Sequence, residues 1–210
     1  MLGRKIKKLK NWLQNRHNLQ LFRLRLAEDR QKTALYRAVL ISHELSATGA
    51  PLMRLAAAEA ILADGGSVRV LAYMDGPLRE KFEKLGISVF YHPGFRDNAR
   101  LLNEFGGDCA YAVANTAVAY PAVSLLKGPR VLWWIHEAQV IEKDYIARFR
   151  QKKFRPDLEQ TLRQAGKLAV VSDYAREIAA KYNPRVEVIH PAVADVAKEQ
   201  GLQPTQPAAN

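Results

Sequence analysis

The chain has 210 residues, of which 48% are hydrophobic and 25% charged, the balance of an ordinary globular protein. No apolar run approaches the roughly 20 residues of a membrane-spanning helix, and the basic N-terminus lacks the apolar core and cleavage site of a secretory signal. The single cysteine, Cys109, excludes an internal disulfide and fits a reducing, cytoplasmic compartment; we interpret it as a small buried hydrophobic residue.

The formal charge of +11 is concentrated at the N-terminus. Residues 1–37 carry eleven Lys or Arg and only two acidic residues, which gives this segment +9 and leaves +2 for the rest. The high net charge therefore belongs to a basic extension, which we assign to residues 1–36.

The basic extension has a helical pattern. Its first apolar residues recur every three or four positions, with Trp12 beside them: Leu2, Ile6, Leu9 and Leu13. A second patch, residues 19–26, mixes leucines and Phe22 with arginines. Two interpretations stay open: a helix on an anionic membrane surface through residues 1–37, or a solvated helix packed on the domain or a partner. A basic run this short is weak evidence for nucleic-acid binding, so no nucleic acid is expected as a partner.

From residue 37 onward, short apolar runs alternate with helical segments. The runs, expected to be buried parallel strands, are residues 39–42, 68–72, 87–91, 110–114, 131–135, 168–171 and 186–189. The expected helices are residues 51–63, 77–85, 96–105, 117–126 and 174–182, with one or two more in the insertion 141–166. This pattern predicts an α/β, Rossmann-like, doubly wound parallel sheet of about seven strands with helices on both faces, over residues 37–194. Residues 195–210 are expected to be a weakly ordered tail.

The first strand, loop and helix form the most informative stretch. The apolar run 38–41 ends in His43 and Glu44, and a loop of mostly small residues (45–50) leads to Pro51 in the first turn of a helix. Free backbone N–H groups at a helix N-terminus bind anions, so the loop is a candidate anion site.

Polar residues follow nearly every predicted strand. They are His43-Glu44, Asp75, His92, Asn115-Thr116, His136-Glu137, Ser172-Asp173 and His190. Ligands of open α/β sheets bind outside the carboxyl ends of the strands, so this convergence favours a ligand-binding crevice. Strand ends are often polar for solvation alone, and the pattern by itself names no reaction.

Several common motifs are absent. Gly49 is the only glycine between Gly3 and Gly65, so the dinucleotide fingerprint G-x-G-x-x-G does not follow the first strand. The sequence also lacks a phosphate-binding P-loop, a zinc-spaced Cys/His cluster and a G-x-S-x-G elbow. Nicotinamide dehydrogenases, P-loop NTPases and serine hydrolases of that type are therefore disfavoured.

An ordered set of motifs over residues 38–194 resembles the N-terminal domain of GT-B glycosyltransferases of family 4, the group 1 type. The motifs are SHELSATGAPLMRLAAAEAIL at residues 42–62, WWIHE at 133–137, VVSDYAR at 170–176 and VIHP at 188–191.

The resemblance implies retaining transfer of a hexosyl-type group from a nucleotide sugar, which is a substrate, with no cofactor and no metal. It places the loop with Thr48 and Gly49 near the donor phosphates and acceptor, and His136 at the reaction centre as the catalytic candidate. His136 would orient an acceptor hydroxyl or stabilise the phosphate leaving group. Further substrate-binding candidates are Glu44, Glu137, Ser172 and Arg176.

The resemblance stops where a donor-binding C-terminal domain would begin, near residue 203. We therefore expect an acceptor-side domain that is incomplete for catalysis alone, with a separate C-terminal domain as a partner and a carbohydrate or lipid-linked acceptor. The expected location is cytoplasmic, at the inner face of the membrane if the basic helix binds there. The alternative is a non-catalytic binding or scaffold module on the same fold, associated with a membrane surface.

Overall fold

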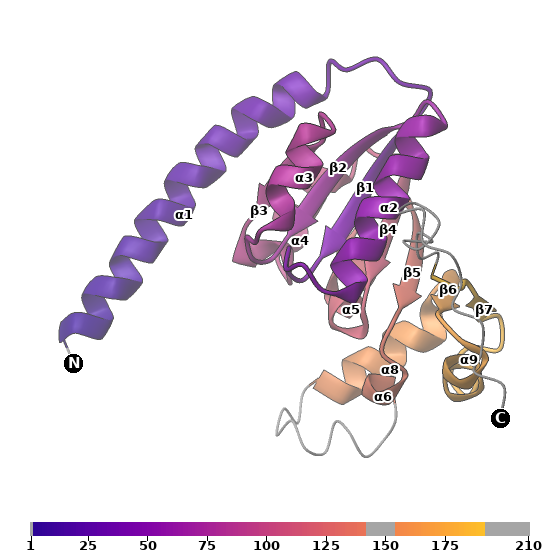
Figure 1. The fold of residues 1–210 in the computed structure, drawn as a ribbon. Helices are drawn as coiled ribbons and strands as arrows, with labels where there is room; N and C mark the ends of the chain where they lie inside the picture. The colour runs from indigo at the N-terminus through magenta and orange to yellow at the C-terminus, as the bar shows by residue number, and fades with distance from the viewer. Residues whose placement is uncertain (1, 142–153, 192–210) are drawn as a thin grey trace, which may run out of the picture.

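A parallel sheet forms the centre of the computed structural model, which describes residues 2–141 and 154–191, with side chains from residue 13 to 141 and from 157 onward (Figure 1). Seven strands form this sheet in the described residues: β1 (Arg37–Ser42), β2 (Ser67–Ala72), β3 (Ser88–Tyr91), β4 (Tyr111–Asn115), β5 (Arg130–Ile135), β6 (Lys167–Val170) and β7 (Glu187–Val188). They lie in the order β3-β2-β1-β4-β5-β6-β7, and all neighbouring pairs are parallel. The predicted Rossmann-like fold is confirmed.

The helices follow the predicted order with shifted ends. They are α1 (Leu2–Asp29), α2 (Gly49–Ala63), α3 (Leu78–Lys84), α4 (Ala99–Gly106), α5 (Tyr120–Leu125), α6 (Ala138–Ile141), α8 (Phe154–Gln164) and α9 (Asp173–Ala179), with 3-10 turns at Pro93–Phe95 and Ala117–Ala119. The helix predicted to begin at residue 96 begins at Ala99, because Asn98 Oδ1 accepts a hydrogen bond from Leu101 N and caps the helix there. Helix α8 confirms a helix in the insertion; residues 142–153 and the predicted tail lie outside the described residues.

Alternate side chains of each central strand enter two separate hydrophobic clusters. In β1, Val39 and Ile41 pack on the side of α4, α5, α8 and α9, whereas Leu40 packs on the side of α2 and α3. Burial on both faces explains why the strands are nearly continuous apolar runs in the sequence.

The strand order reverses between β1 and β4. From β1 the chain passes through α2 to β2, and from β4 through α5 to β5, so the two connections leave the sheet in opposite directions (Figure 1). The loops at the carboxyl ends of β1 and β4 therefore diverge, and such a reversal is where open α/β sheets bind ligands.

Helix α1 is continuous over 28 residues, and its second half packs on the domain. Phe22 and Leu26 are buried, and the Phe22 ring meets Phe90 edge to face at 5.6 Å between centroids. Ion pairs join Arg23 to Glu104, Arg25 to Glu83 and Arg30 to Asp108. The interpretation of a helix packed on the domain is therefore supported for this half, while the N-terminal end extends away from the sheet (Figure 1).

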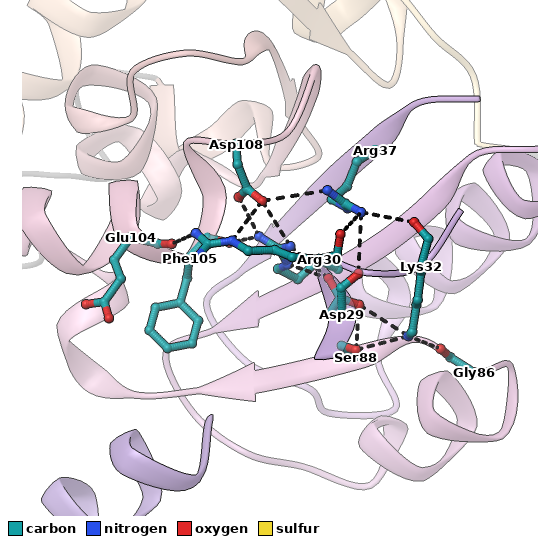
Figure 2. Close-up of polar contacts among 10 residues, drawn as sticks. Asp29, Arg30, Lys32, Arg37, Gly86, Ser88, Glu104, Phe105 and Asp108 are labelled. Atoms are coloured by element: carbon teal, nitrogen blue, oxygen red, sulfur yellow. Dashed lines mark hydrogen bonds and ion pairs between the residues drawn. The ribbon is translucent and has the colours of Figure 1, made fainter. Parts of the chain in front are cut away.

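The C-terminal end of α1 is fixed at the amino edge of the sheet by a buried ionic cluster (Figure 2). Arg69 of β2 is fully buried, and its guanidinium contacts Asp29 Oδ2 at 2.8 and 2.9 Å and Asp108 Oδ1 at 2.7 Å. Ser88 also belongs to the cluster, because its hydroxyl donates a hydrogen bond to Asp29 Oδ1 at 2.6 Å. The cluster ties α1, β2, β3 and the segment after α4 together, on the edge opposite the candidate site.

No helix within residues 2–141 and 154–191 combines the length and the apolar character needed to cross a membrane.

Candidate functional site

The loops that follow β1, β4 and β5 meet at the carboxyl edge of the sheet. Asn115 Nδ2 lies 3.2 Å from His136 Nε2 and 3.5 Å from the carbonyl oxygen of Ala50 at the start of α2. Glu137 Oε2 accepts a hydrogen bond of 3.3 Å from Ala117 N in the loop after β4. The structure therefore brings together the predicted residues Glu137 and His136 and the N-terminal turn of α2.

His136 is neutral at physiological pH. Burial, reinforced by the positive charge of Arg54, lowers the pKa of its imidazole to about 4. With Asn115 Nδ2 as the donor to Nε2, the ring carries its proton on Nδ1, and the indole of Trp134 lies 4.6 Å away between ring centroids. A fixed neutral imidazole of this kind serves as a hydrogen-bond donor rather than as an imidazolium acid.

The loop after β4 is held in an unusual conformation. Thr116 has φ 73° and ψ 154°, a region occupied almost only by glycine, and its hydroxyl is buried without a partner among the described residues. Its carbonyl oxygen accepts a 2.8 Å hydrogen bond from Trp133 Nε1, which fixes the peptide. Nothing in the sequence signals this strain, because threonine has no preference for such backbone angles.

The side chains of the loop after β1 form hydrogen bonds with one another, and no atom packs against Gly49. Ser46 Oγ donates to Glu44 Oε1 at 2.8 Å and lies 2.9 Å from Thr48 Oγ1, so Thr48 does not cap α2 through its side chain. A Cβ atom added to Gly49 would meet no atom within 4 Å. Gly49 is exposed, and neither packing nor a positive φ explains this glycine at the first position of α2.

Arg54 lies near the candidate residues and was not predicted from the sequence. It lies on the buried face of α2 with Pro51 and Ala58, is 1% exposed, and interacts electrostatically with Glu137, His136 and His43. Burial lowers the pKa of its guanidinium to about 9. The spacing in the sequence could have indicated its burial. Arg54 follows Pro51 by three positions and precedes Ala58 by four, so it falls on the apolar face of a helix.

Ser172 and Arg176 have local partners on α9. Ser172 Oγ accepts a hydrogen bond from Ala175 N and caps the helix, and Arg176 forms an exposed ion pair of 3.0 Å with Asp173. Within the described part of the chain, no hydrogen bond or ion pair links these two residues to the loops after β1, β4 and β5. Their assignment to the site stays a prediction.

No group of three or more His, Cys, Asp or Glu residues in the described ranges is arranged to hold a metal ion. Cys109 is buried, and burial raises the pKa of its thiol to about 11, which is typical of an unreactive core cysteine.

The sheet order and the helices on both faces define a doubly wound α/β domain. The model of the family described as glycosyl-transferase family 4 matches residues 36–195. The chain therefore belongs to glycosyltransferase family 4, as its motifs predicted.

Solved glycosyltransferase structures share the fold. An α-glucosyltransferase in complex with UDP and a 13-mer DNA containing a HMU base aligns with a TM-score of 0.53 at 15% identity, over 79% of this chain and 44% of that one. Anabaena HepE in complex with UDP and glucose aligns with a TM-score of 0.53 at 13% identity, over 79% of this chain and 50% of that one. The chain thus spans about half the length of these proteins. A comparison with curated protein sequences finds no significant match.

Proposed function

We propose that this chain is the N-terminal, acceptor-side domain of a retaining glycosyltransferase that uses a nucleotide sugar. The observation that carries the proposal is the neutral His136, held by Asn115 at the strand reversal of a family 4 domain. The open space at Gly49, beside the N-terminus of α2, supports a role in binding an anionic substrate group.

In this proposal His136 is the catalytic residue and the neighbouring loops bind substrate. Its Nδ1 proton orients an acceptor hydroxyl or stabilises the departing phosphate. The substrate-binding residues are Glu44, Thr48, Gly49, Glu137, Ser172 and Arg176. Glu137 acts partly by bonding Ala117 N, which positions the loop after β4. The nucleotide sugar is a substrate, and no metal or cofactor is part of the proposal.

Calorimetric titration with UDP, GDP and their sugars tests this site. His136→Ala and Gly49→Val are expected to weaken binding of the preferred ligand at least tenfold. The matched controls are His17→Ala, an exposed histidine on α1, and Gly166→Val, whose added Cβ also meets no atom within 4 Å. Unchanged affinity in both site variants would contradict the proposed site.

We further propose that transfer requires a donor-side domain in addition to these 210 residues, because this chain spans about half of the matched glycosyltransferases. The 210-residue chain is expected to release no sugar from radiolabelled UDP-glucose or GDP-mannose. Turnover above a His136→Ala control would contradict this part of the proposal.

The second candidate function is a non-catalytic binding or scaffold module. The absence of ligand binding at millimolar nucleotide sugar would favour it over the first candidate.

A membrane surface is the second partner that we propose, through α1. Leu13, Leu21 and Leu24 are 52%, 46% and 66% exposed, and Leu13 and Leu24 are about three turns apart on the side opposite Phe22. Such a basic helix with exposed leucines suits an anionic lipid surface and a cytoplasmic location at the inner face of the membrane. Sedimentation with vesicles containing 30% phosphatidylserine should fall several-fold for Leu13→Glu/Leu24→Glu, and equal sedimentation would contradict the proposal.

A further inference from the structure

Arg54 differs from Arg69, the other fully buried arginine among the residues whose side chains are described. For Arg69, all three guanidinium nitrogens have acceptors, provided by Asp29, Asp108 and the carbonyl oxygen of Phe105. For Arg54, none of Nε, Nη1 and Nη2 has a hydrogen-bond partner within residues 2–141 and 154–191, although the side chain is 1% exposed. Buried guanidinium groups are normally satisfied, so Arg54 requires an explanation beyond folding.

The groups around Arg54 belong to the candidate site. Its charge acts on His43 and His136, which follow β1 and β5, and it is attracted to Glu137. No ion pair joins Arg54 to Glu137 among the described residues, and Glu137 Oε2 instead accepts from Ala117 N. The guanidinium therefore lies near residues of the candidate site, where Glu137 is the acidic side chain that interacts with it electrostatically and no acceptor among the described residues is within bonding distance.

The start of α2 adds a second anion-binding feature on the same side of the helix. Arg54 is one turn after Ala50 and therefore shares its face, and the carbonyl oxygen of Ala50 contacts Asn115 in the site. Thr48 provides no side-chain cap, and Gly49 borders open space. Helix α2, which has 15 residues, thus provides two positive groups on one side: its N-terminus and the guanidinium of Arg54.

We propose that Arg54 is a substrate-binding residue whose guanidinium takes a phosphate or carboxylate group of the substrate, bound between the N-terminus of α2 and the loop after β5. The planar fork of arginine matches two oxygens of such a group, and the described residues supply Arg54 with no such acceptor. The oxyanion comes either from the diphosphate of the donor or from an acidic group on the acceptor. This inference rests on the proposed function for the identity of the site, and on the unpartnered guanidinium for its chemistry.

The proposal predicts opposite effects of one substitution on stability and on binding. Arg54→Met replaces a desolvated, unpartnered charge by an apolar side chain of similar length, so the ligand-free protein should unfold at a higher temperature. The same variant should lose its ligand site. A residue with a purely structural role would instead lower the unfolding temperature when replaced.

The test is thermal unfolding and calorimetry of the 210-residue chain at low ionic strength with four probes. Pyrophosphate and UDP represent the donor diphosphate, and glucose 6-phosphate and glucuronate represent an acidic acceptor. Arg54→Met should raise the unfolding temperature of the ligand-free protein. It should lower the affinity for any probe that the parent binds by at least tenfold. Arg54→Lys should retain intermediate affinity, because it keeps the charge and loses the fork. Arg130→Met, an exposed arginine at the amino edge, controls for the change in net charge and should bind like the parent.

Affinity within twofold of the parent in Arg54→Met would overturn the inference, as would a lack of binding of all four probes by the parent chain. If Arg54→Met does not fold, Arg54→Gln replaces it in the same comparison. Binding of UDP-glucose that is independent of Arg54 would retain the proposed function and reject this inference. Binding of pyrophosphate that depends on Arg54, without any nucleotide-sugar binding, would retain the inference and reject the proposed function.

Discussion

An arginine is buried near each edge of the sheet, and the two differ in whether the fold provides partners for the guanidinium. At the amino edge, Arg69 forms ion pairs with Asp29 and Asp108. These ion pairs join helix α1 to the sheet (Figure 2). At the carboxyl edge, Arg54 is equally buried and has no partner among the described residues. The guanidinium of Arg69 is thus satisfied within the fold, whereas that of Arg54 lacks an acceptor within residues 2–141 and 154–191.

The same contrast extends to acids and histidines. Burial would raise the pKa of Asp29, but hydrogen bonds from Ser88 and Arg69 outweigh it and hold that pKa below its usual value. At the other edge burial dominates: it raises the pKa of Glu137 and lowers the pKa of His136 to about 4. Perturbation by uncompensated burial is typical of functional sites, which supports the assignment of the carboxyl edge.

The largest expected effect comes from breaking the amino-edge cluster. Arg69→Met leaves Asp29, itself 3% exposed, without its main counter-charge, so we expect the free energy of unfolding to fall by about 3–5 kcal/mol. Urea denaturation followed by circular dichroism measures this loss. Lys167→Met, which breaks the exposed pair with Glu187, should change it by less than about 1 kcal/mol. A loss below about 1 kcal/mol for Arg69→Met would show that the cluster does not hold the framework.

The next effect is a pH dependence specific to the carboxyl edge. Because the folded pKa of His136 is about 4 and its unfolded value is near 6.5, the unfolded chain binds the proton first as the pH falls. Stability should therefore be lost between about pH 6.5 and 4, by on the order of 2 kcal/mol for His136 after allowance for its partial exposure. Asp29 and Asp108, whose folded pKa values are lowered, contribute stability above about pH 4 that is lost only below it.

His136→Gln should flatten the change in unfolding free energy between pH 7 and 5, measured by urea denaturation at each pH. His43 and His92, whose pKa values burial also lowers, account for a residual slope. Asp29→Asn should leave the change in unfolding free energy between pH 7 and 5 as it is, and alter the pH dependence only below about pH 4. The same slope in His136→Gln and the parent would contradict the assigned pKa of His136.

Sequence patterns predicted the strands, their parallel arrangement and the polar residues at their ends, because burial on both faces leaves a local signature. They did not predict the roles of the two arginines. Arg69 in the run SVRVLA and Arg54 in α2 are both charges within apolar elements. Only the fold brings Asp29, forty residues away in the chain, to Arg69, and it brings no acidic partner from the described residues to Arg54. Pairing between distant residues has no local signature, so framework and site cannot be separated from sequence alone.

The candidate site was predicted to the same limit. His136 and Glu137 were predicted because they follow a strand, and the structure places His136 beside Asn115, which also contacts Ala50, the residue after Gly49. Their roles in a site stay predictions. Arg54 was missed because it lies inside a helix, and the backbone of Thr116 was missed because tertiary contacts impose it. For α1 the periodicity predicted a helix, but its packing through Phe22 and Leu26 depends on β3 and α4.

A smaller effect tests the strain at the carboxyl edge. Alanine is normally preferred to glycine by about 0.4–1 kcal/mol, because glycine has more freedom in the unfolded chain. At φ 73° and ψ 154° that order should reverse, so Thr116→Gly should be more stable than Thr116→Ala by about 1 kcal/mol. Paired urea denaturation curves of the two variants measure the difference. If Thr116→Ala is the more stable variant, the loop after β4 is not strained.

The smallest effect concerns Ser172, which lies at the carboxyl edge and also caps a helix. Its hydroxyl caps α9 by accepting from Ala175 N at 3.2 Å, so Ser172→Ala should lower the free energy of unfolding by about 0.5–1 kcal/mol. Ser172→Asp keeps a capping oxygen and a favourable charge at the helix N-terminus, and should restore that stability. Calorimetry with UDP on both variants decides whether the residue also belongs to the site. If Ser172 faces a bound phosphate, the aspartate weakens binding while the protein stays stable; if affinity is unchanged in both, Ser172 serves the framework alone.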